Sequence, residues 1–212
     1  MEGLRIGPGN LGGKGVYAAR EFTAGEVVIA FTLEPLTREQ FDALAPGEER
    51  FVHSYGGRRW LYPAPARWVN HADQPSCYED FERSCDVALR RIEAGEPVTI
   101  DARQETDREL STFLDAYVSA QQGHDAGGLR DLISPDVVLW EHGRVTRGAY
   151  DVASVLTAHP ASELSEPEWH VATGRWEALC SAVAAGDGAT EHVSLFLRVL
   201  HGNWQVVYDH RG

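Results

Sequence analysis

The feature of this sequence that most constrains its fold is a change of pattern near Glu105. Before it, short apolar segments of strand length are separated by glycines, and only one short helix is predicted, starting at a capping box on Thr37. After it, apolar residues recur at helical spacing over 108–122, two shorter helical segments follow, and long strands end the chain. This order predicts an α+β protein with two domains, 1–104 and 105–212.

The second half is predicted to contain three helices followed by a meander of antiparallel strands. The change from helical to strand pattern is abrupt, and glycine-containing turns separate the strands. The expected helices cover 108–122, 126–133 and 148–156, the expected strands cover 137–140, 169–184, 191–200 and 204–210, and the turns fall at Gly186-Asp187-Gly188 and His201-Gly202-Asn203.

Charge and residue usage exclude several classes of protein. The 212 residues carry a net charge of −13, so we expect no nucleic-acid partner, because phosphates need neutralising. No apolar run approaches the roughly 20 residues that span a bilayer, and no signal peptide is visible, so we expect a cytoplasmic protein without membrane contact. The three cysteines form no disulfide framework, and the nine histidines show no metal-ligand spacing, so no metal site is predicted.

Three stretches of the first half carry candidate chemistry. They are Gly12-Gly13-Lys14-Gly15-Val16-Tyr17-Ala18, then 67–76 around Asn70-His71, and then 94–102 around Gly95-Glu96-Pro97. Taken singly, each reads as an ordinary turn into a strand. The first is not a phosphate loop, because no Gly-Lys-Ser/Thr and no helix follow it.

Together, in this order and spacing, the three stretches resemble the SET domain, the β-rich fold of many protein lysine methyltransferases. The resemblance covers 3–102. The family patterns G-x-G-V-x-A, R-F-x-N-H-S-C-x-P-N and G-E-E-L-x-x-D-Y are matched at Gly13, Gly15, Val16 and Ala18, at Arg67, Asn70, His71 and Pro75, and at Gly95, Glu96 and Asp101.

The resemblance implies a cofactor and a substrate. The cofactor is S-adenosylmethionine, and the residues it assigns to that cofactor are Gly13, Lys14, Gly15, Arg67, Asn70 and His71. The substrate it implies is a lysine of a basic protein or peptide, which an acidic chain attracts.

One departure from the family concerns catalysis. The closing tyrosine that orients the amine in the family is replaced by Ala102, and methyl transfer depends on that orientation. Tyr78 is a candidate for supplying a hydroxyl, although a strand aromatic in this place also fits simple core packing. Two functions stay open for this half: a methyltransferase, and a catalytically degenerate module that only binds.

The second half resembles the cone-shaped α+β domain of the SnoaL-like and nuclear-transport-factor-2-like superfamily, which includes ketosteroid isomerase. The stretches 132–140, 147–148 and 202–210 carry this resemblance. It implies a pocket between sheet and helices, and an isomerase, cyclase or hydrolase activity on a small molecule is the alternative function. Strand alternation selects as candidate pocket residues Trp140, His142, Phe196, Tyr208 and His210.

The strand 191–200 is apolar on both faces, which a sheet with one wet face would not be. The helices of the domain cover only one face, so a second copy of the chain is the simplest cover for the other. We therefore expect a homodimer through the C-terminal sheet, with the face of Leu197 at the interface and the face of Phe196 lining the pocket.

Overall fold

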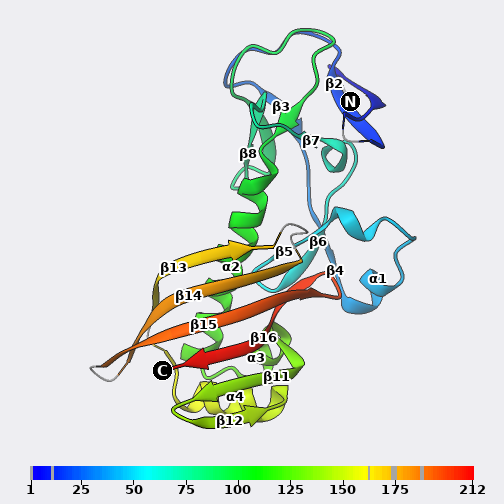
Figure 1. Ribbon diagram of the computed structural model, residues 1–212. Helices are drawn as coiled ribbons and strands as arrows, with labels where there is room; N and C mark the ends of the chain where they lie inside the picture. Colours follow the sequence, from blue (N-terminus) through cyan, green and yellow to red (C-terminus); the bar gives the residue numbers. More distant parts are fainter. Residues whose placement is uncertain (1, 11, 162, 173–175, 187–188) are drawn as a thin grey trace. The chain divides into compact units, whose positions relative to one another are not determined.

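The computed structural model describes residues 2–10, 12–161, 163–172, 176–186 and 189–212 (Figure 1). The chain forms two compact units: 1–36, 45–52 and 60–107 make the first, and 37–44, 53–59 and 108–212 make the second. The sequence predicts a single division between 104 and 105. The structure divides the chain after Asp107 instead, and it assigns two segments of the N-terminal half to the second unit.

The first unit consists of short strands. The hairpin of β1 and β2 is antiparallel, β7 and β10 form a parallel pair, and a three-stranded sheet has the order β3-β9-β8. A further sheet has the order β4-β6-β5. The bounds are β1 Leu4–Pro8, β2 Lys14–Ala18, β3 Val27–Ala30, β4 Glu34–Leu36, η1 Glu49–Phe51, β5 Val52–Tyr55, β6 Arg58–Leu61, η2 Ala66–Trp68, β7 Asn70–His71, β8 Cys77–Asp80, β9 Cys85–Ala88 and β10 Thr99–Ile100.

The second unit is built on a six-stranded sheet with the order β12-β11-β16-β15-β14-β13 (Figure 1). Its neighbours are antiparallel except β11 and β16, which are parallel. The long strand predicted over 169–184 is two strands, and the predicted turn at Asp187 and Gly188 lies outside the described residues. The bounds are β11 Ile133–Glu141, β12 Arg144–Arg147, β13 Glu163–Val171, β14 Glu177–Gly186, β15 Ala189–Leu200 and β16 Asn203–Arg211.

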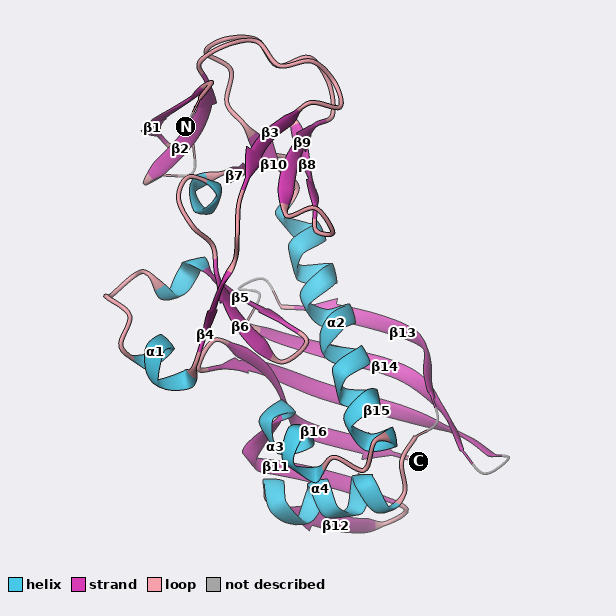
Figure 2. Cartoon of the chain, turned by 180° about the vertical axis from the view of Figure 1, so that it is seen from behind, coloured by secondary structure: helices cyan, strands magenta, loops and turns pink. Residues whose placement is uncertain are grey.

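Helices α2 (Ala102–Gln122), α3 (Ala126–Leu132) and α4 (Ala149–Ala158) have the sheet on one side of them (Figure 2). The first of them begins before the predicted position 108, because the carboxylate of Asp101 accepts a hydrogen bond from the backbone of Arg103 at 3.1 Å and satisfies a free donor of the first turn. The short helix α1 (Arg38–Asp42) starts with the predicted capping box on Thr37. No helix in the described ranges is long and apolar enough to cross a membrane.

The buried face of the sheet is the one that contains Val193, Leu195 and Leu197. These side chains are at most 1% exposed and belong to one core with Leu110, Phe113 and Tyr117 of α2. The expectation that the face of Leu197 forms a dimer interface is therefore wrong. The helices of the same unit pack on that face and leave the face of Phe196 outward.

Candidate functional site

The three motif stretches of the first half lie side by side. Strand β7, which is Asn70 and His71, pairs in parallel with β10 of the third stretch. The third stretch is also bonded to β2 of the first, through Ala18 N to Glu96 O at 2.9 Å and Val98 N to Val16 O at 2.9 Å. The third stretch thus joins the other two by backbone hydrogen bonds.

Asn70 connects the first and second stretches through its side chain. Its amide Nδ2 donates to the backbone oxygen of Lys14 at 3.1 Å and to that of Trp68 at 3.3 Å. A Cβ at Gly15 would lie 3.1 Å from the same Nδ2 and 3.1 Å from the backbone Cα of Gly9, so a side chain there would crowd both neighbours. The second glycine of the motif is explained by these contacts.

A pocket of about 540 Å³ opens beside Asn70, which is within the usual range for small-molecule sites. Four of the six predicted cofactor residues line it. Gly15 and His71 are outside the lining, the first next to the Asn70 amide and the second against Ala102. The lining consists of Gly12, Gly13, Lys14, Glu48, Arg50, Phe51, Arg67, Trp68, Val69 and Asn70.

Arg67 builds one wall of this pocket. Its guanidinium donates to the Glu48 carboxylate at 2.6 Å and to the backbone oxygen of Tyr62 at 2.8 Å, and it lies 5.3 Å from the centroid of the Phe51 ring. Arg67 therefore has a structural use in the motif, because the arginine holds Glu48 and Phe51 at the pocket.

The lining has a surplus of positive charge, with three cations and one carboxylate in a chain of net charge −13. Since Arg67 is paired with Glu48, Lys14 and Arg50 supply the surplus. The Nζ of Lys14 lies 4.1 Å from the centroid of the Trp68 ring, which favours a cation over an aromatic face. A ligand with a carboxylate and a flat apolar part suits these groups.

His71 organises the end of the third stretch. Its Nδ1 accepts a hydrogen bond from the backbone N–H of Ala102 at 3.2 Å, and its Nε2 lies 3.6 Å from a carboxylate oxygen of Asp73. The neighbouring Asp101 has its pKa lowered, chiefly by hydrogen bonds from the Arg103 side chain. This part of the site is a set of bonds that fixes the start of α2.

Tyr78, the candidate for the missing catalytic hydroxyl, lies on β8 and is 37% exposed. Its strand neighbours Cys77 and Glu79 are buried, so Tyr78 faces the opposite side of the strand. It is outside the pocket lining.

Two carboxylates are buried next to each other in the same sheet. Glu79 on β8 is paired in register with Asp86 on β9, and Glu79 accepts a hydrogen bond from the Tyr62 hydroxyl. Burial raises the pKa of Asp86 well above its usual range, and the charges of Glu79 and Glu105 raise it further. Burial also raises the pKa of the Cys77 thiol to about 12, which makes it unreactive.

The five residues predicted to line a pocket in the second unit lie on the outer face of its sheet or in an exposed turn. Phe196 is half-buried on the outer face, Trp140 is 41% and Tyr208 37% exposed, and the side chain of His142 is 69% exposed with its Nε2 3.6 Å from a carboxylate oxygen of Glu191. His210 is paired in register with Trp140, on the outer face.

The reason is a β-bulge in β16. Tyr208 pairs with Phe196, whereas Val206 pairs with the next residue, Leu197, so Val207 is an extra residue on this strand. Simple alternation would place Trp204, Val206, Tyr208 and His210 on one face. The bulge turns the first two inward and the last two outward.

Sequence reasoning missed the polar groups that do lie inside the second unit. Tyr117 donates to Asp209 at 2.7 Å, and the guanidinium of Arg211 donates to Asp209 at 3.1 Å and to Gln121 at 3.2 Å. All four side chains are at most 2% exposed. Simple alternation along β16, which ignores the bulge, places Asp209 and Arg211 on the face opposite Trp204 and Val206. The sequence pattern therefore gives no signal that these two side chains are buried in the core. The hydrogen bonds among the four side chains form a buried network, in which Gln121 Nε2 has no hydrogen-bond partner among the described residues.

The pocket residues Glu48, Arg50 and Phe51 were also missed, because they belong to none of the three motifs. The 3₁₀ helix η1, which ends at Phe51, is too short to leave a periodic pattern. Within the part of the chain that the structure describes, no group of three or more His, Cys, Asp or Glu side chains is placed to hold a metal ion.

Residues 13–101 match the family model described as SET domain. A search of curated proteins finds no significant match. Among solved structures, a Plasmodium falciparum protein provisionally named a histone methyltransferase is 18% identical, with a TM-score of 0.37, over 46% of this chain and 94% of its own.

Other similar structures correspond to the C-terminal half of this chain. An NTF2-like protein of unknown function from Pseudomonas putida is 17% identical, with a TM-score of 0.42, over 49% of this chain and 83% of its own. A Shewanella frigidimarina protein provisionally named a ketosteroid isomerase is 17% identical, with a TM-score of 0.41, over 50% of this chain and 97% of its own. These values describe similarity of fold alone.

Proposed function

Because residues 13–101 match the SET domain family model, we propose that this chain binds S-adenosylmethionine in the pocket beside Asn70 and transfers its methyl group to a lysine of a basic protein or peptide. The observation that carries the proposal is that the glycine turn and the central motif line one pocket together, while the third motif is bonded to both of them. The hydrogen bond from Asn70 to the Lys14 backbone joins two of them directly.

The residues of the pocket offer partners for two parts of this cofactor, its adenine and its carboxylate. Its adenine needs a flat apolar surface, which Trp68 and Phe51 offer, and its carboxylate needs positive charge, which Lys14 and Arg50 offer. No described heavy atom lies within 4 Å of a Cβ built on Gly13, so the backbone there is open to a ligand.

When bound, S-adenosylmethionine supplies an electrophilic methyl group on a sulfonium. The chain's own contribution is positioning: Asn70 holds the glycine turn against the central motif, and Arg67 holds the wall of Glu48 and Phe51. Positioning of the two reactants is the main route to acceleration of such a transfer. The acidic surface favours approach of a basic substrate.

A second candidate function is binding without transfer. It is favoured by Ala102 at the place of the family's closing tyrosine and by Tyr78, whose ring is exposed and outside the pocket lining. An enzyme activity in the second unit has less support. The polar residues predicted for its pocket face outward, and its buried polar side chains bond to each other.

Transfer of a radiolabelled methyl group from S-adenosylmethionine to basic peptides tests the proposal. Labelled lysine, absent with the Asn70→Ala variant, supports a methyltransferase. Binding of the cofactor without labelled peptide supports the second candidate. Absence of both binding and transfer contradicts both.

We further propose that the second unit assembles with a second copy through the outer face of its sheet. Leu179, Phe196 and Tyr208 are adjacent in one row across three strands, and Leu179 and Tyr208 are each 37% exposed. Trp140, one strand further, adds to the same face. Contiguous apolar side chains of this kind favour an interface.

A further inference from the structure

We infer that Arg50 makes this pocket selective for the charge of its ligand, so that S-adenosylhomocysteine binds more tightly than S-adenosylmethionine. This inference rests on the proposed function of the pocket and adds a regulation to it, because a site that retains its product slows as the product accumulates. Arg50 belongs to none of the three motifs. Every residue that carries the argument belongs to the first unit.

The charges of the pocket lining are the first observation. Arg67 is neutralised by Glu48, whose carboxylate accepts its hydrogen bond at 2.6 Å. The other two cations, Lys14 and Arg50, form no ion pair with any carboxylate of the residues that the structure describes. The pocket therefore presents two positive charges to a ligand, although the whole chain has a net charge of −13.

The two cations differ in how well they suit a carboxylate. The Nζ of Lys14 lies 4.1 Å from the centroid of the Trp68 ring. The Cζ of Arg50 lies 4.9 Å from the centroid of the Phe51 ring, and Arg50 is exposed. An ammonium acts as a point charge, whereas a flat guanidinium donates two parallel hydrogen bonds to one carboxylate. We therefore assign recognition of the ligand's carboxylate to Arg50.

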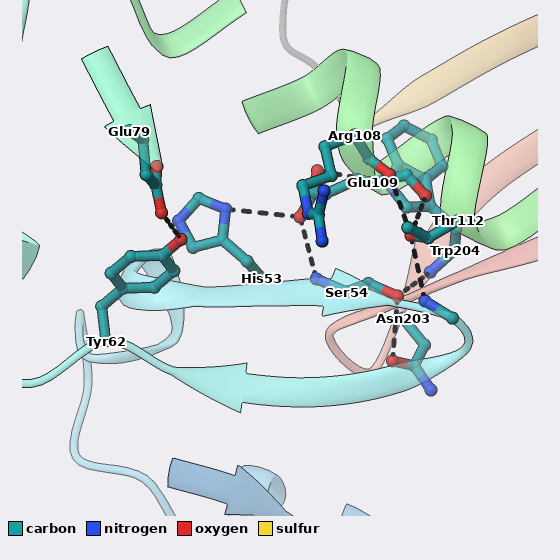
Figure 3. A network of polar contacts seen from close by, with 10 residues as sticks. His53, Ser54, Tyr62, Glu79, Arg108, Glu109, Thr112, Asn203 and Trp204 are labelled. Atoms are coloured by element: carbon teal, nitrogen blue, oxygen red, sulfur yellow. Dashed lines mark hydrogen bonds and ion pairs between the residues drawn. The ribbon is translucent and has the colours of Figure 1, made fainter. Parts of the chain in front are cut away.

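The segment that carries Arg50 is fixed by bonds within the first unit. Arg50 lies in η1, where the backbone N–H of Phe51 donates to Glu48 O at 3.1 Å. The backbone oxygen of Phe51 accepts from the N–H of Tyr62 at 3.1 Å. Tyr62 in turn donates its hydroxyl to Glu79, and both residues are at most 7% exposed (Figure 3). Because its backbone is held in this way, Arg50 loses less conformational freedom when it binds a ligand.

The two ligands differ by one methyl group and one charge. Both contain an ammonium and a carboxylate, whereas only S-adenosylmethionine also carries a positive sulfonium. The attraction between Arg50 and the carboxylate is therefore common to both ligands, while repulsion by the cations of the pocket acts on the sulfonium of the cofactor alone. Repulsion between two unit charges about 4 Å apart in water changes a Kd about fivefold, and we expect a preference for the product of this size.

The experiment uses three ligands that differ by one charged part at a time. 5′-Methylthioadenosine contains the adenosine and an uncharged sulfur, S-adenosylhomocysteine adds the ammonium and the carboxylate, and S-adenosylmethionine adds the sulfonium. The Kd of each ligand for the full chain is measured by calorimetry at low ionic strength, where charges are little screened.

Two variants and a matched control are compared with the wild type. Arg50→Gln removes the charge, and Arg50→Lys keeps the charge without the fork of donors. The control is Arg5→Gln, which makes the same change at another exposed arginine of the first unit. The Cζ of Arg5 lies 5.0 Å from the centroid of the Tyr17 ring, and this residue is outside the pocket lining.

Each ligand has its own expected response. Arg50→Gln should weaken binding of S-adenosylhomocysteine about tenfold, because hydrogen bonds to a charged group are lost. It should weaken binding of S-adenosylmethionine less, because repulsion of the sulfonium is lost at the same time, and it should leave 5′-methylthioadenosine unchanged. Arg50→Lys should keep the preference for the product, and Arg5→Gln should resemble the wild type.

Equal Kd values of the wild type for S-adenosylhomocysteine and S-adenosylmethionine overturn the inference. A loss in Arg50→Gln that is the same for all three ligands, or no loss for S-adenosylhomocysteine, overturns it as well. In these cases the cofactor still binds to the wild type, so the proposed function stands. A wild type that binds neither S-adenosylmethionine nor S-adenosylhomocysteine contradicts the proposed function, and the inference fails with it.

Discussion

Asn70 donates its side-chain amide to the backbone oxygen of Lys14 over 3.1 Å, which joins motifs 56 residues apart in the sequence. The same amide also donates to Trp68, so both of its hydrogens are directed at backbone oxygens. This arrangement makes the glycine turn and the central motif one structural element, and it explains why Gly15 has no side chain.

The first prediction concerns that close approach. Gly15→Ala should weaken binding of S-adenosylhomocysteine about tenfold or more, because its Cβ would displace the Asn70 amide at an estimated cost of about 1–3 kcal/mol. Gly7, which is paired with Gly15 in the same hairpin, provides the control. Its Cβ would contact only the edge of the Tyr17 ring at 3.1 Å, so Gly7→Ala should bind normally in the same titration.

The second prediction concerns the missing tyrosine. Ala102→Tyr should raise methyl transfer to basic peptides, because it restores a hydroxyl at the position that the family uses to orient the amine. Ala102→Phe adds the same ring without the hydroxyl and should give no increase. Equal initial rates for the wild type and both variants would show that another group orients the amine.

The third prediction concerns pH and stability. The pKa of Asp86 is raised in the folded state, chiefly by burial and then by the charges of Glu79 and Glu105. The folded chain therefore keeps a proton that the unfolded chain loses above its ordinary pKa of about 3.9. Stability from this group is complete below that value and is lost as the pH rises toward the folded pKa.

Asp86→Asn imitates the protonated form at every pH. The free energy of unfolding of the variant, minus that of the wild type, should therefore increase as the pH rises from about 4 to about 7, as measured by urea denaturation. Asp115→Asn, an exposed change on α2, should show no such trend. A constant difference between Asp86→Asn and wild type across this range would contradict the assigned protonation.

The fourth prediction concerns assembly. The wild type should be a dimer in light scattering, and Phe196→Glu should give monomers, because a charge on the outer face cannot be buried without a partner. Ser119→Glu adds the same charge at an exposed site on α2 and should leave the dimer intact. A monomeric wild type at micromolar concentration rules out this interface.

Leu197→Glu, at a position with 0% exposure, should unfold the second unit instead of only separating the copies.

Local signals predicted much of the fold. The capping box at Thr37 and the helical periodicity of α2 are both present, because each depends on neighbouring residues. The bulge at Val207 has no such signal, and it reversed the faces expected for Tyr208 and His210.

The candidate site was predictable to a similar degree. The motifs identified Lys14, Arg67 and Asn70, which line the pocket. Glu48 and Phe51 could not be found, because their position depends on a long-range pair with Arg67. The assignment of 37–44 and 53–59 to the second unit is likewise set by tertiary contacts, which composition and periodicity do not encode.

The most direct test of the central claim is a calorimetric titration of the full chain with S-adenosylmethionine and S-adenosylhomocysteine, for wild type and Asn70→Ala. We predict one binding site in the wild type and loss of binding in the variant, which should still unfold cooperatively with a midpoint lowered by several degrees, since the side chain contributes two hydrogen bonds of about 1 kcal/mol each. Equal binding by both proteins, or no binding by the wild type, would contradict the assignment of this pocket to the cofactor.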